Sequence, residues 1–326
     1  MSKTRKIKLG KKAPLPRWVG VIHLGPLPGS PLADSRLKPY EIIHQVGYQA
    51  IRDAKLLVNA GFDGILIENF NDAPFFKDQV PTETVTAMTI IAAAMRESLS
   101  CHLGINVLRN DALTALKIAA SAPLDFIRCN LLSGVIASDQ GMIESQAAQL
   151  LREKKRLQSD VKILADVDVK HAKSLSQFSL EQSIHEVVSR SLADGVILTG
   201  SQTGSFPQPE SIEIGMQTAR KQGVPCYIGS GVSFETIDEA KELDVGLIIG
   251  SVFRKGGVAG QAIDSTRLNR FKRLLKSKMK KKKAKTKRKK TKSDQKKSPS
   301  VRRRRTSENR KNPGSNPVQS DNQLVP

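Results

Sequence analysis

The feature that most constrains this chain is a regular alternation of short apolar segments and longer amphipathic ones. Eight segments have the length and composition of buried strands, and each is followed by a stretch with helical spacing of its apolar residues. The first helical stretch ends before Gly61, a typical C-cap, and Asp111 and Ser233 are typical N-caps of later stretches. We predict strands at 18–24, 64–70, 101–108, 126–132, 162–170, 195–200, 225–231 and 245–251, and helices at 38–60, 82–98, 111–121, 141–158, 180–193, 209–222, 233–242 and 261–277.

Eight strands that are each followed by a helix predict an α/β fold, the (β/α)₈ or TIM-like barrel. A doubly wound open sheet of eight strands is the alternative. We predict three parts: a basic N-terminal arm at residues 1–17, the barrel at 18–277, and a disordered Lys/Arg-rich tail at 278–326.

The net charge of +22 is concentrated at the two ends of the chain. Residues 1–17 hold seven basic residues and no acidic one, and residues 270–326 hold 23 Lys/Arg and three Asp/Glu. The part between them, 18–269, holds 23 basic and 28 acidic residues and is mildly acidic. Its roughly 250 residues are enough for one large buried core.

Composition also indicates the compartment. Cys101, Cys129 and Cys226 are few, odd in number and lie inside apolar runs, which is typical of core thiols in a reducing compartment. No apolar run approaches the roughly 20 residues of a membrane helix, and the basic N-terminus lacks the apolar region of a secretory signal. We expect a cytoplasmic protein, with peripheral membrane association through its basic tail as an alternative.

The fifth predicted strand carries charged residues where a buried strand should be apolar. Because alternate side chains of a strand share one face, Asp166, Asp168 and Lys170 lie on one face, and His171 follows them. Unpaired buried charge is costly, so these groups must be paired or functional. Paired carboxylates suit proton transfer, a clamp on sugar hydroxyls or Mg²⁺ ligation, and a structural ion-pair network is the alternative.

Polar residues occur at the C-terminal ends of the other predicted strands as well. Active sites of (β/α)₈ barrels lie at this rim, although satisfied polar layers inside a barrel give the same pattern. The residues concerned are His23, Glu68, Asn69, Asn106, Arg128, Asn130 and Thr199.

The last two predicted strands end in glycine-containing turns, at Gly229, Ser230 and Gly231 and at Gly250 and Ser251. Glycine lets backbone N–H groups approach an anion, and the loops after strands seven and eight often bind phosphate in this fold. We therefore predict a phosphate site there, with simple tight turns as the alternative.

His23 precedes a Pro-rich turn, residues 24–31, that we expect to lie over the barrel mouth. It is a candidate acid/base or phosphate partner, and a core histidine fits the spacing equally well. The sequence has no His-x-x-His or paired-Cys motif for zinc, and no Walker A, Gly-x-Gly-x-x-Gly or Gly-x-Ser-x-Gly motif.

The tail contains Lys280 to Lys283, Lys287 to Lys290 and Arg302 to Arg305, and no aromatic residue follows Phe271. Such runs bind nucleic-acid phosphates or an anionic membrane surface without reading sequence, and stacking on bases is not expected.

Several segments together resemble the BtpA family (BtpA/SgcQ), over about residues 17–271. They are residues 23–31 (HLGPLPGSP), 68–75 (ENFNDAPF), 104–111 (GINVLRND), 137–141 (ASDQG), 165–172 (ADVDVKHA), 203–204 (TG) and 229–231 (GSG). The resemblance implies a TIM-barrel-like fold of the phosphate-binding type. It also implies a link, in photosynthetic bacteria, to the biogenesis or stability of photosystem I, while one branch is described as sugar-operon or nucleosidase-like proteins. Residues 250–255 (GSVFRK) depart from the family pattern at the eighth strand, and the basic tail is not part of the family core.

Two hypotheses of different class follow. In the first, the protein binds or converts a phosphorylated sugar or nucleoside-like molecule at the rim. Asp166, Asp168, Lys170, His23 and Glu68 would be catalytic, and Asn106, Asn130, Thr199, Gly229, Ser230, Gly231, Gly250 and Ser251 would bind the substrate and its phosphate. In the second, it is a non-catalytic assembly factor whose tail docks on nucleic acid or anionic membrane. Mg²⁺ is the candidate cofactor, and a second copy of the chain is a further candidate partner.

Overall fold

The computed structural model describes residues 14–167, 172–174, 178–200 and 205–276 of the chain. The chain divides into two units, Met1–Met279 and Lys280–Pro326, and the second lies outside the described residues, together with the predicted basic tail. Within the first unit, all eight predicted strands are present. They are β1 (Trp18–His23), β2 (Gly64–Glu68), β3 (His102–Asn106), β4 (Phe126–Cys129), β7 (Lys162–Asp166), β9 (Gly195–Leu198), β10 (Cys226–Ile228) and β11 (Gly246–Ile249).

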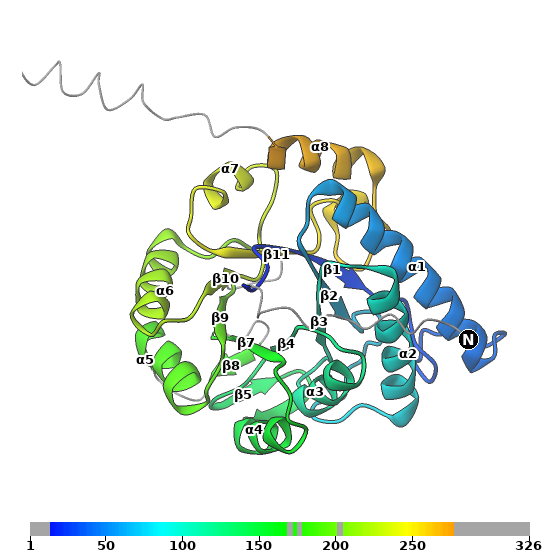
Figure 1. The fold of residues 1–326 in the computed structure, drawn as a ribbon, viewed down its shortest axis with the longest axis horizontal. Helices are drawn as coiled ribbons and strands as arrows, with labels where there is room; N and C mark the ends of the chain where they lie inside the picture. The colour runs from blue at the N-terminus through cyan, green and yellow to red at the C-terminus, as the bar shows by residue number, and fades with distance from the viewer. Residues whose placement is uncertain (1–13, 168–171, 175–177, 201–204, 277–326) are drawn as a thin grey trace, which may run out of the picture. The chain divides into compact units, whose positions relative to one another are not determined.

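The eight strands form a closed barrel in the order β1-β11-β10-β9-β7-β4-β3-β2, and every neighbouring pair is parallel. Trp18 of β1 pairs with Leu247 of β11, so the first and last strands close the ring (Figure 1). This confirms the (β/α)₈ prediction and excludes the open sheet, because an open sheet would leave two unpaired edge strands.

Helices surround the strand ring in chain order (Figure 1). The longest, α1, begins after Lys38, where the Glu41 side chain accepts a hydrogen bond from the Lys38 amide, and ends at Gly61, whose φ of 114° only glycine adopts readily. The Asp111 carboxylate caps α3 by accepting from the Thr114 amide. The helices are α1 (Pro39–Ala60), α2 (Thr82–Ser98), α3 (Ala112–Ser121), α4 (Ala147–Arg156), α5 (Leu180–His185) with a π-helical turn (Glu186–Arg190), α6 (Pro209–Lys221), α7 (Ile237–Ala240) and α8 (Ser265–Lys276).

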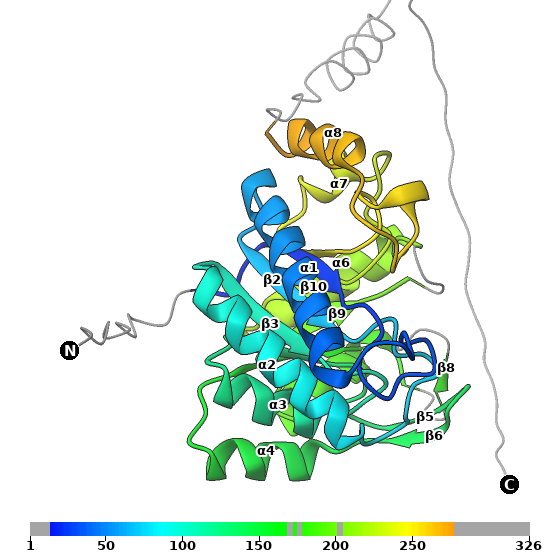
Figure 2. The same ribbon diagram turned by 90° about the vertical axis from the view of Figure 1, so that its right-hand side faces the viewer.

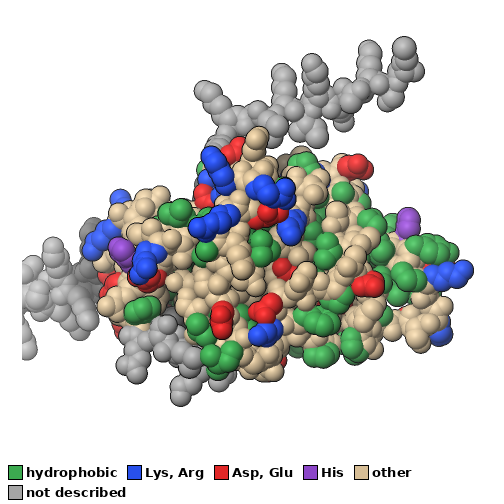
Figure 3. Space-filling model, turned by 90° about the horizontal axis from the view of Figure 1, so that it is seen from below, with side chains coloured by type: hydrophobic (Ala, Val, Ile, Leu, Met, Phe, Trp, Pro, Cys, Tyr) green, Lys and Arg blue, Asp and Glu red, His purple; other side chains and the backbone are tan. Residues whose placement is uncertain are grey.

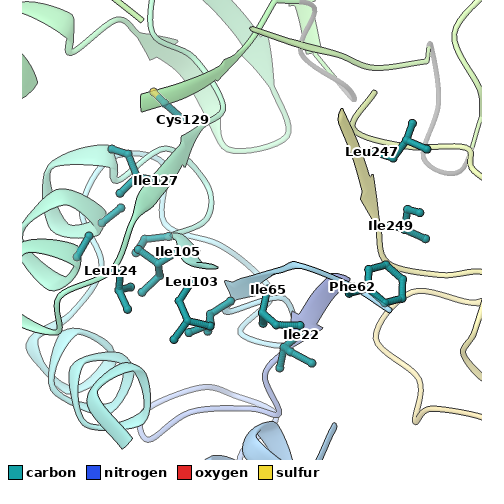
Figure 4. Packing of buried hydrophobic residues seen from close by; sticks show 14 of the residues in the cluster. Ile22, Phe62, Ile65, Leu103, Ile105, Leu124, Ile127, Cys129, Leu247 and Ile249 are labelled. Carbon is teal, nitrogen blue, oxygen red and sulfur yellow. The ribbon is translucent and has the colours of Figure 1, made fainter. Parts of the chain in front are cut away.

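The hydrophobic core has two layers because each strand has two faces. Outward-facing residues such as Ile22, Ile65, Leu103 and Ile249 pack between the barrel and the helices (Figure 4). The alternate residues point into the barrel and fill it at mid-height. This inner cluster contains Val19, Val21, Leu66, Phe126, Leu164, Ile197, Tyr227 and Ile248.

One part of the secondary structure differs from the sequence prediction. Residues 141–144 were predicted as the start of a helix, but they form strand β6 (Gly141–Glu144), which pairs with β5 (Val135–Ser138) as an antiparallel hairpin. Strand β8 (Ala172–Ser174) pairs with the other edge of β5. Tertiary pairing overrides local helix propensity here, and Gly141, with φ of 96°, makes the hairpin turn. The small sheet lies at one end of the barrel (Figure 2).

Two predicted boundaries also shift. The strand predicted at 162–170 ends at Asp166 among the described residues, and 168–171 lie outside them. The Ser233 hydroxyl accepts from the Glu235 and Thr236 amides and so begins a turn, while helix α7 begins four residues later.

The described surface has no dominant charge on the face in Figure 3, where acidic, basic and hydrophobic side chains are interspersed. This agrees with the small net charge of residues 18–269. None of the described helices is long and apolar enough to cross a membrane.

Candidate active site at the C-terminal rim of the barrel

A polar layer lies one step above the apolar interior of the barrel. Glu68 lies two residues after Leu66 on β2, and Arg128 lies two residues after Phe126 on β4. Because alternate residues of a strand share a face, Glu68 and Arg128 point into the barrel as Leu66 and Phe126 do. Two positions of this layer are glycine, Gly229 and Gly250, and these leave space above the core. The inward positions of the layer are His23, Glu68, Asn106, Arg128, Asp166, Thr199, Gly229 and Gly250.

The centre of the layer is a buried ion-pair network around Arg128. Its Nε and Nη2 donate to Oδ1 and Oδ2 of Asp166 at 3.2 and 3.1 Å, and its Nη1 donates to Oε1 of Glu68 at 3.3 Å. Asn106 Nδ2 adds a bond to Oε1 of Glu68 at 3.0 Å, and Asn130 Nδ2 adds one to Oδ2 of Asp166 at 2.8 Å. Arg128 therefore positions both carboxylates, and the amides complete their hydrogen bonding.

The protonation of Arg128 follows from this geometry. Burial opposes its charge, but the adjacent carboxylates of Asp166 and Glu68 outweigh burial and hold the pKa of Arg128 above its usual value. Asp166 accepts three hydrogen bonds in the network and has the surroundings of a structural anion.

His23 lies beside this network and is held in one tautomer. The amide of Gly260 donates to Nδ1 of His23 at 3.0 Å, so the proton of the neutral ring is on Nε2. Burial, then the positive charges of Arg254 and Arg128, lower the pKa of His23 to about 3. Its Nε2 is 3.9 Å from Oε2 of Glu68, which is too long for a direct hydrogen bond.

Arg254 is a second buried cation, and it binds backbone oxygens in place of carboxylates. Its Nε, Nη1 and Nη2 donate to the carbonyl oxygens of Gly250, Gln261 and Val21 at 2.8, 2.6 and 2.8 Å. Burial lowers the pKa of Arg254 to about 10, so it stays protonated at neutral pH. This charge lies directly behind the turn at Gly250.

The polar layer forms the floor of a cavity of about 690 Å³. This is the size of a small-molecule site. The β5–β6 hairpin lines it with Asp139 and Gln140, and Phe70, Phe75 and Leu108 add apolar surface. The last two strand ends form one wall, with Gly229, Ser230, Gly231, Gly250, Ser251 and the following loop at Gly257, Val258 and Ala259.

Steric constraints require glycine at two positions of this wall, because a Cβ atom would clash with neighbouring atoms. A Cβ at Gly231 would lie 2.1 Å from the Phe206 amide nitrogen, and φ there is +78°. A Cβ at Gly229 would lie 2.5 Å from Ile197 Cγ2. The Ser230 hydroxyl accepts from the Gly200 amide at 3.3 Å and donates to the Ser205 carbonyl at 3.1 Å, so it already has partners within the protein.

The structure brings ten of the predicted site residues to this one cavity, and it places one more in a second cavity. Thr199 lines a neighbouring cavity of about 520 Å³, between β9 and the loop at 205–208. Asp168 and Lys170 lie outside the described residues. The ten are His23, Glu68, Asn106, Asn130, Asp166, Gly229, Ser230, Gly231, Gly250 and Ser251.

The sequence pattern indicates that Arg128 is a polar residue at a strand end, but it does not indicate that Arg128 is the centre of the ion-pair network. It does not indicate Arg254 or Gly260 as site residues. Arg128 follows the same alternation as Glu68, so its inward position was available from the pattern. Arg254 and Gly260 follow the last strand, in a loop where no periodicity indicates which groups turn inward.

Among the described residues, no group of three His, Cys, Asp or Glu side chains is arranged to hold a metal ion. Glu68 and Asp166, the two carboxylates of the floor, are bridged by the Arg128 guanidinium, which occupies the place a cation would take between them. The geometry around these two residues therefore favours an arginine-bridged site, and Mg²⁺ remains a prediction from the sequence.

Comparison with known proteins identifies the family. The model of the BtpA family matches residues 15–277. The chain belongs to the BtpA family. It is 42% identical over 253 residues to the Photosystem I biogenesis protein BtpA of Synechocystis sp., which covers 78% of this chain and 85% of that relative. It is 41% identical over 261 residues to the uncharacterised protein MJ1115 of Methanocaldococcus jannaschii, covering 80% and 94% of the two chains.

Among solved structures, the BtpA-family barrel described here is similar to tryptophan synthase from M. tuberculosis, with a TM-score of 0.49 and 14% identity over 79% of this chain and 90% of that chain.

Proposed function

We propose that this BtpA-family protein binds a phosphorylated sugar or nucleoside-like small molecule in the cavity at the C-terminal rim of its barrel. The observation that supports this best is that two different surfaces border the same cavity. The floor around Arg128 is charged and hydrogen-bonded. The wall consists of two glycine-containing turns, with Arg254 behind the turn at Gly250.

The phosphate is placed against the turns after β10 and β11. Backbone amides at glycines can approach phosphate oxygens closely, and Gly229, Gly231 and Gly250 have no side chains of their own. Arg254 adds a positive charge behind Gly250 that is bonded to neutral carbonyls. A buried charge of this kind favours an anion at the turn without contacting it.

The unphosphorylated part of the ligand is placed over the floor. Glu68 and Asn106 offer hydrogen-bonding groups to hydroxyls, and Phe70 and Phe75 offer apolar surface to a sugar face or a base. Asn130 donates its amide to Asp166, and within the described part of the chain its buried Oδ1 has no hydrogen-bond partner. A ligand hydroxyl or N–H group at this oxygen would satisfy it.

Thermal denaturation of the full-length protein with a panel of ligands tests the proposal. The panel contains sugar phosphates, nucleotides and their unphosphorylated counterparts, each with and without Mg²⁺. At a hundredfold excess over Kd, a ligand of the native state should raise Tm by about 5 °C or more. Only phosphorylated compounds should do so.

A charge variant locates the phosphate. Ser251→Asp places a carboxylate at the rim turn and should abolish the shift, while Ser100→Asp makes the same change at an exposed position before β3, at the opposite end of the barrel, and should not. Equal shifts with phosphorylated and unphosphorylated compounds, or an unchanged shift in Ser251→Asp, would contradict the assignment.

A second function is favoured by the similarity to the photosystem I biogenesis protein of Synechocystis sp.. In this alternative the barrel is a scaffold in an assembly process, and the Lys/Arg-rich segment after residue 278 binds nucleic acid or an anionic membrane surface. Two results would favour this assembly role. The barrel would bind no phosphorylated compound, and the full-length chain would co-purify with a protein complex.

A further inference from the structure

We propose that Glu68 and His23 form a proton-transfer pair that acts on a phosphorylated α-hydroxy aldehyde or ketone, with Glu68 as the base and His23 as the hydrogen-bond donor to the carbonyl oxygen. This inference rests on the proposed function, because it places the substrate in the same cavity. It adds a reaction class, isomerisation or epimerisation next to a carbonyl group.

One carboxylate oxygen of Glu68 accepts hydrogen bonds from neighbouring side chains, and the other oxygen is available to a substrate. Oε1 accepts from Asn106 and Arg128, at 3.0 and 3.3 Å. Among the described residues, Oε2 accepts no hydrogen bond, and Nε2 of His23 lies 3.9 Å from it. The bonds to Oε1 fix the carboxylate in place, so Oε2 is a positioned base on a residue that lines the cavity.

His23 complements this base as a neutral donor. Its Nδ1 is occupied by the Gly260 amide, so only Nε2–H faces Glu68. Burial, Arg254 and Arg128 keep its pKa near 3, and the ring therefore donates a hydrogen bond as neutral imidazole at neutral pH. A neutral imidazole is a suitable partner for a carbonyl oxygen that gains negative charge, because the proton affinities of donor and oxyanion are closer than those of an imidazolium and the oxyanion.

The 3.9 Å separation suits a substrate that bridges the two groups. A carbonyl oxygen bound to Nε2–H would bring the adjacent carbon near Oε2. Glu68 then removes the proton from that carbon, the electrons of the C–H bond form a C=C bond, and the electrons of the carbonyl π bond move to the oxygen held by His23. For isomerisation, the proton of the neighbouring hydroxyl group passes to the oxyanion, and Glu68 returns its proton to the former carbonyl carbon. For epimerisation, Glu68 loses its proton to solvent, and a solvent proton is added to the opposite face of the first carbon. Neither route needs a redox partner.

The other groups of the floor support this assignment. Asp166 accepts three hydrogen bonds from Arg128 and Asn130, so it is less available as a base than Glu68. Arg128 and Arg254 both lie close enough to lower the pKa of His23, and the same positive charges stabilise an enediolate in the cavity. Arg254 acts through His23 and the Gly250 turn, and is a positioning residue.

Exchange of carbon-bound hydrogen with solvent is the direct test. The full-length protein is incubated in D₂O with ribose 5-phosphate, glucose 6-phosphate and dihydroxyacetone phosphate, and deuterium at the carbon next to the carbonyl is followed by NMR. Wild type should incorporate deuterium into at least one compound that also raises Tm. Glu68→Gln should lower the rate about 100-fold or more, and His23→Gln should lower it by a similar factor.

Two controls separate the outcomes. Glu97→Gln removes an exposed carboxylate on α2 and should leave exchange unchanged, and all variants are purified identically so that a contaminating isomerase would show equal rates in all of them. A phosphorylated hydroxamic acid, which imitates the enediolate, should inhibit exchange in wild type even if a variant fails to fold.

The binding and exchange measurements together distinguish a wrong reaction class from a wrong ligand class. Binding of a sugar phosphate without any exchange overturns the reaction and leaves the ligand site intact. Release of a free base or sugar without exchange also overturns it. If no phosphorylated compound binds, the ligand class and the reaction are both wrong.

Discussion

The amide of Gly260 donates a hydrogen bond to Nδ1 of His23 at 3.0 Å, and this bond connects the loop after the last strand with the end of the first strand. The ring of His23 also packs against Phe70 after β2 in a tilted arrangement, with 4.2 Å between ring centroids. Two separate segments thus hold one imidazole, and this determines which of its nitrogens faces Glu68.

The lowered pKa of His23 predicts a specific dependence of stability on pH. Between pH 6.5 and about pH 3 the unfolded chain binds a proton at His23 that the folded protein does not, so this contribution to stability is present above pH 6.5 and is lost as pH falls. Its slope is up to about 1.4 kcal/mol per pH unit. His23→Gln should flatten the curve of unfolding free energy against pH relative to wild type, as measured by urea denaturation at pH 4.5, 5.5 and 6.5.

The charged and titratable groups that face His23 are Glu68, Arg128 and Arg254. His44→Gln, at an exposed position of α1, is the matched control and should keep the wild-type slope. Parallel curves for wild type and His23→Gln would show that the ring is not buried as a neutral group.

Arg254 should determine the charge state of His23 from behind the rim. Arg254→Met removes a positive charge that lowers the pKa of His23, so that pKa should rise, and three carbonyl oxygens lose their donor. We expect a stability loss of about 3 kcal/mol or more. NMR titration of the His23 ring measures the pKa, and Arg254→Lys, which keeps the charge, should shift it less. An equal pKa in wild type and Arg254→Met would disprove the electrostatic role.

Removal of Arg128 should be costly because it leaves two buried carboxylates without a cation. Arg128→Met should lower the unfolding free energy by about 3–5 kcal/mol at pH 7. Arg152→Met, at an exposed position of α4, is the control, with an expected loss of about 0.5 kcal/mol or less. A loss below about 1 kcal/mol for Arg128→Met would mean that the ion pairs do not form in solution.

The barrel interior offers a test of packing that is independent of the site. Gly104 of β3 pairs with Phe126 of β4, and a Cβ at Gly104 would lie 2.2 Å from Phe126 Cε2. Gly104→Ala should therefore destabilise the protein by about 1–3 kcal/mol. Phe126→Leu should relieve the clash, so the double variant should lose less than the sum of the single variants. Additive losses would indicate that Phe126 does not fill the space beside Gly104.

The basic segment predicts salt-dependent binding to polyanions. The full-length chain should bind heparin or RNA of mixed sequence, and binding should weaken about 1,000-fold between 50 and 200 mM salt if six or more phosphates are contacted. Deletion of residues 280–326 should abolish it while Tm of the barrel stays unchanged. Binding that persists after deletion, or that is insensitive to salt, would refute this role for the segment.

The barrel was predictable because its signal is repeated eight times. Each predicted strand is present within a few residues of its expected bounds, since a strand buried on both faces needs a continuous apolar run. The β5–β6 hairpin was not predictable in the same way. Residues 141–144 continue into α4 without a strong break, and only pairing with β5, next to the barrel mouth, fixes them as a strand.

In the candidate site, too, features that follow from local sequence pattern were predictable, and features that depend on contacts between distant segments were not. Glu68, Asn106 and Asp166 are recognisable because each is a polar residue at the end of an apolar strand. The sequence does not indicate which oxygen of Glu68 is left available, nor that Gly260 binds His23 from 237 positions away, because both depend on contacts between distant segments. Thr199 follows the same rule of alternation as Asp166, yet it lines a different cavity, where the loop at 205–208 forms the opposite wall.

The pairing of β1 with β11 has a consequence for synthesis on the ribosome. Strand β1 is made first and can pair with β2 as soon as β2 emerges, but its other edge waits for the last strand of the ring. Until then the growing sheet has an open, apolar edge of the kind that recruits other chains. Closure by β11 buries this edge, and the loop that follows at once delivers Arg254 and Gly260 to His23, so the nascent chain gains its barrel and its candidate active site in the same late step.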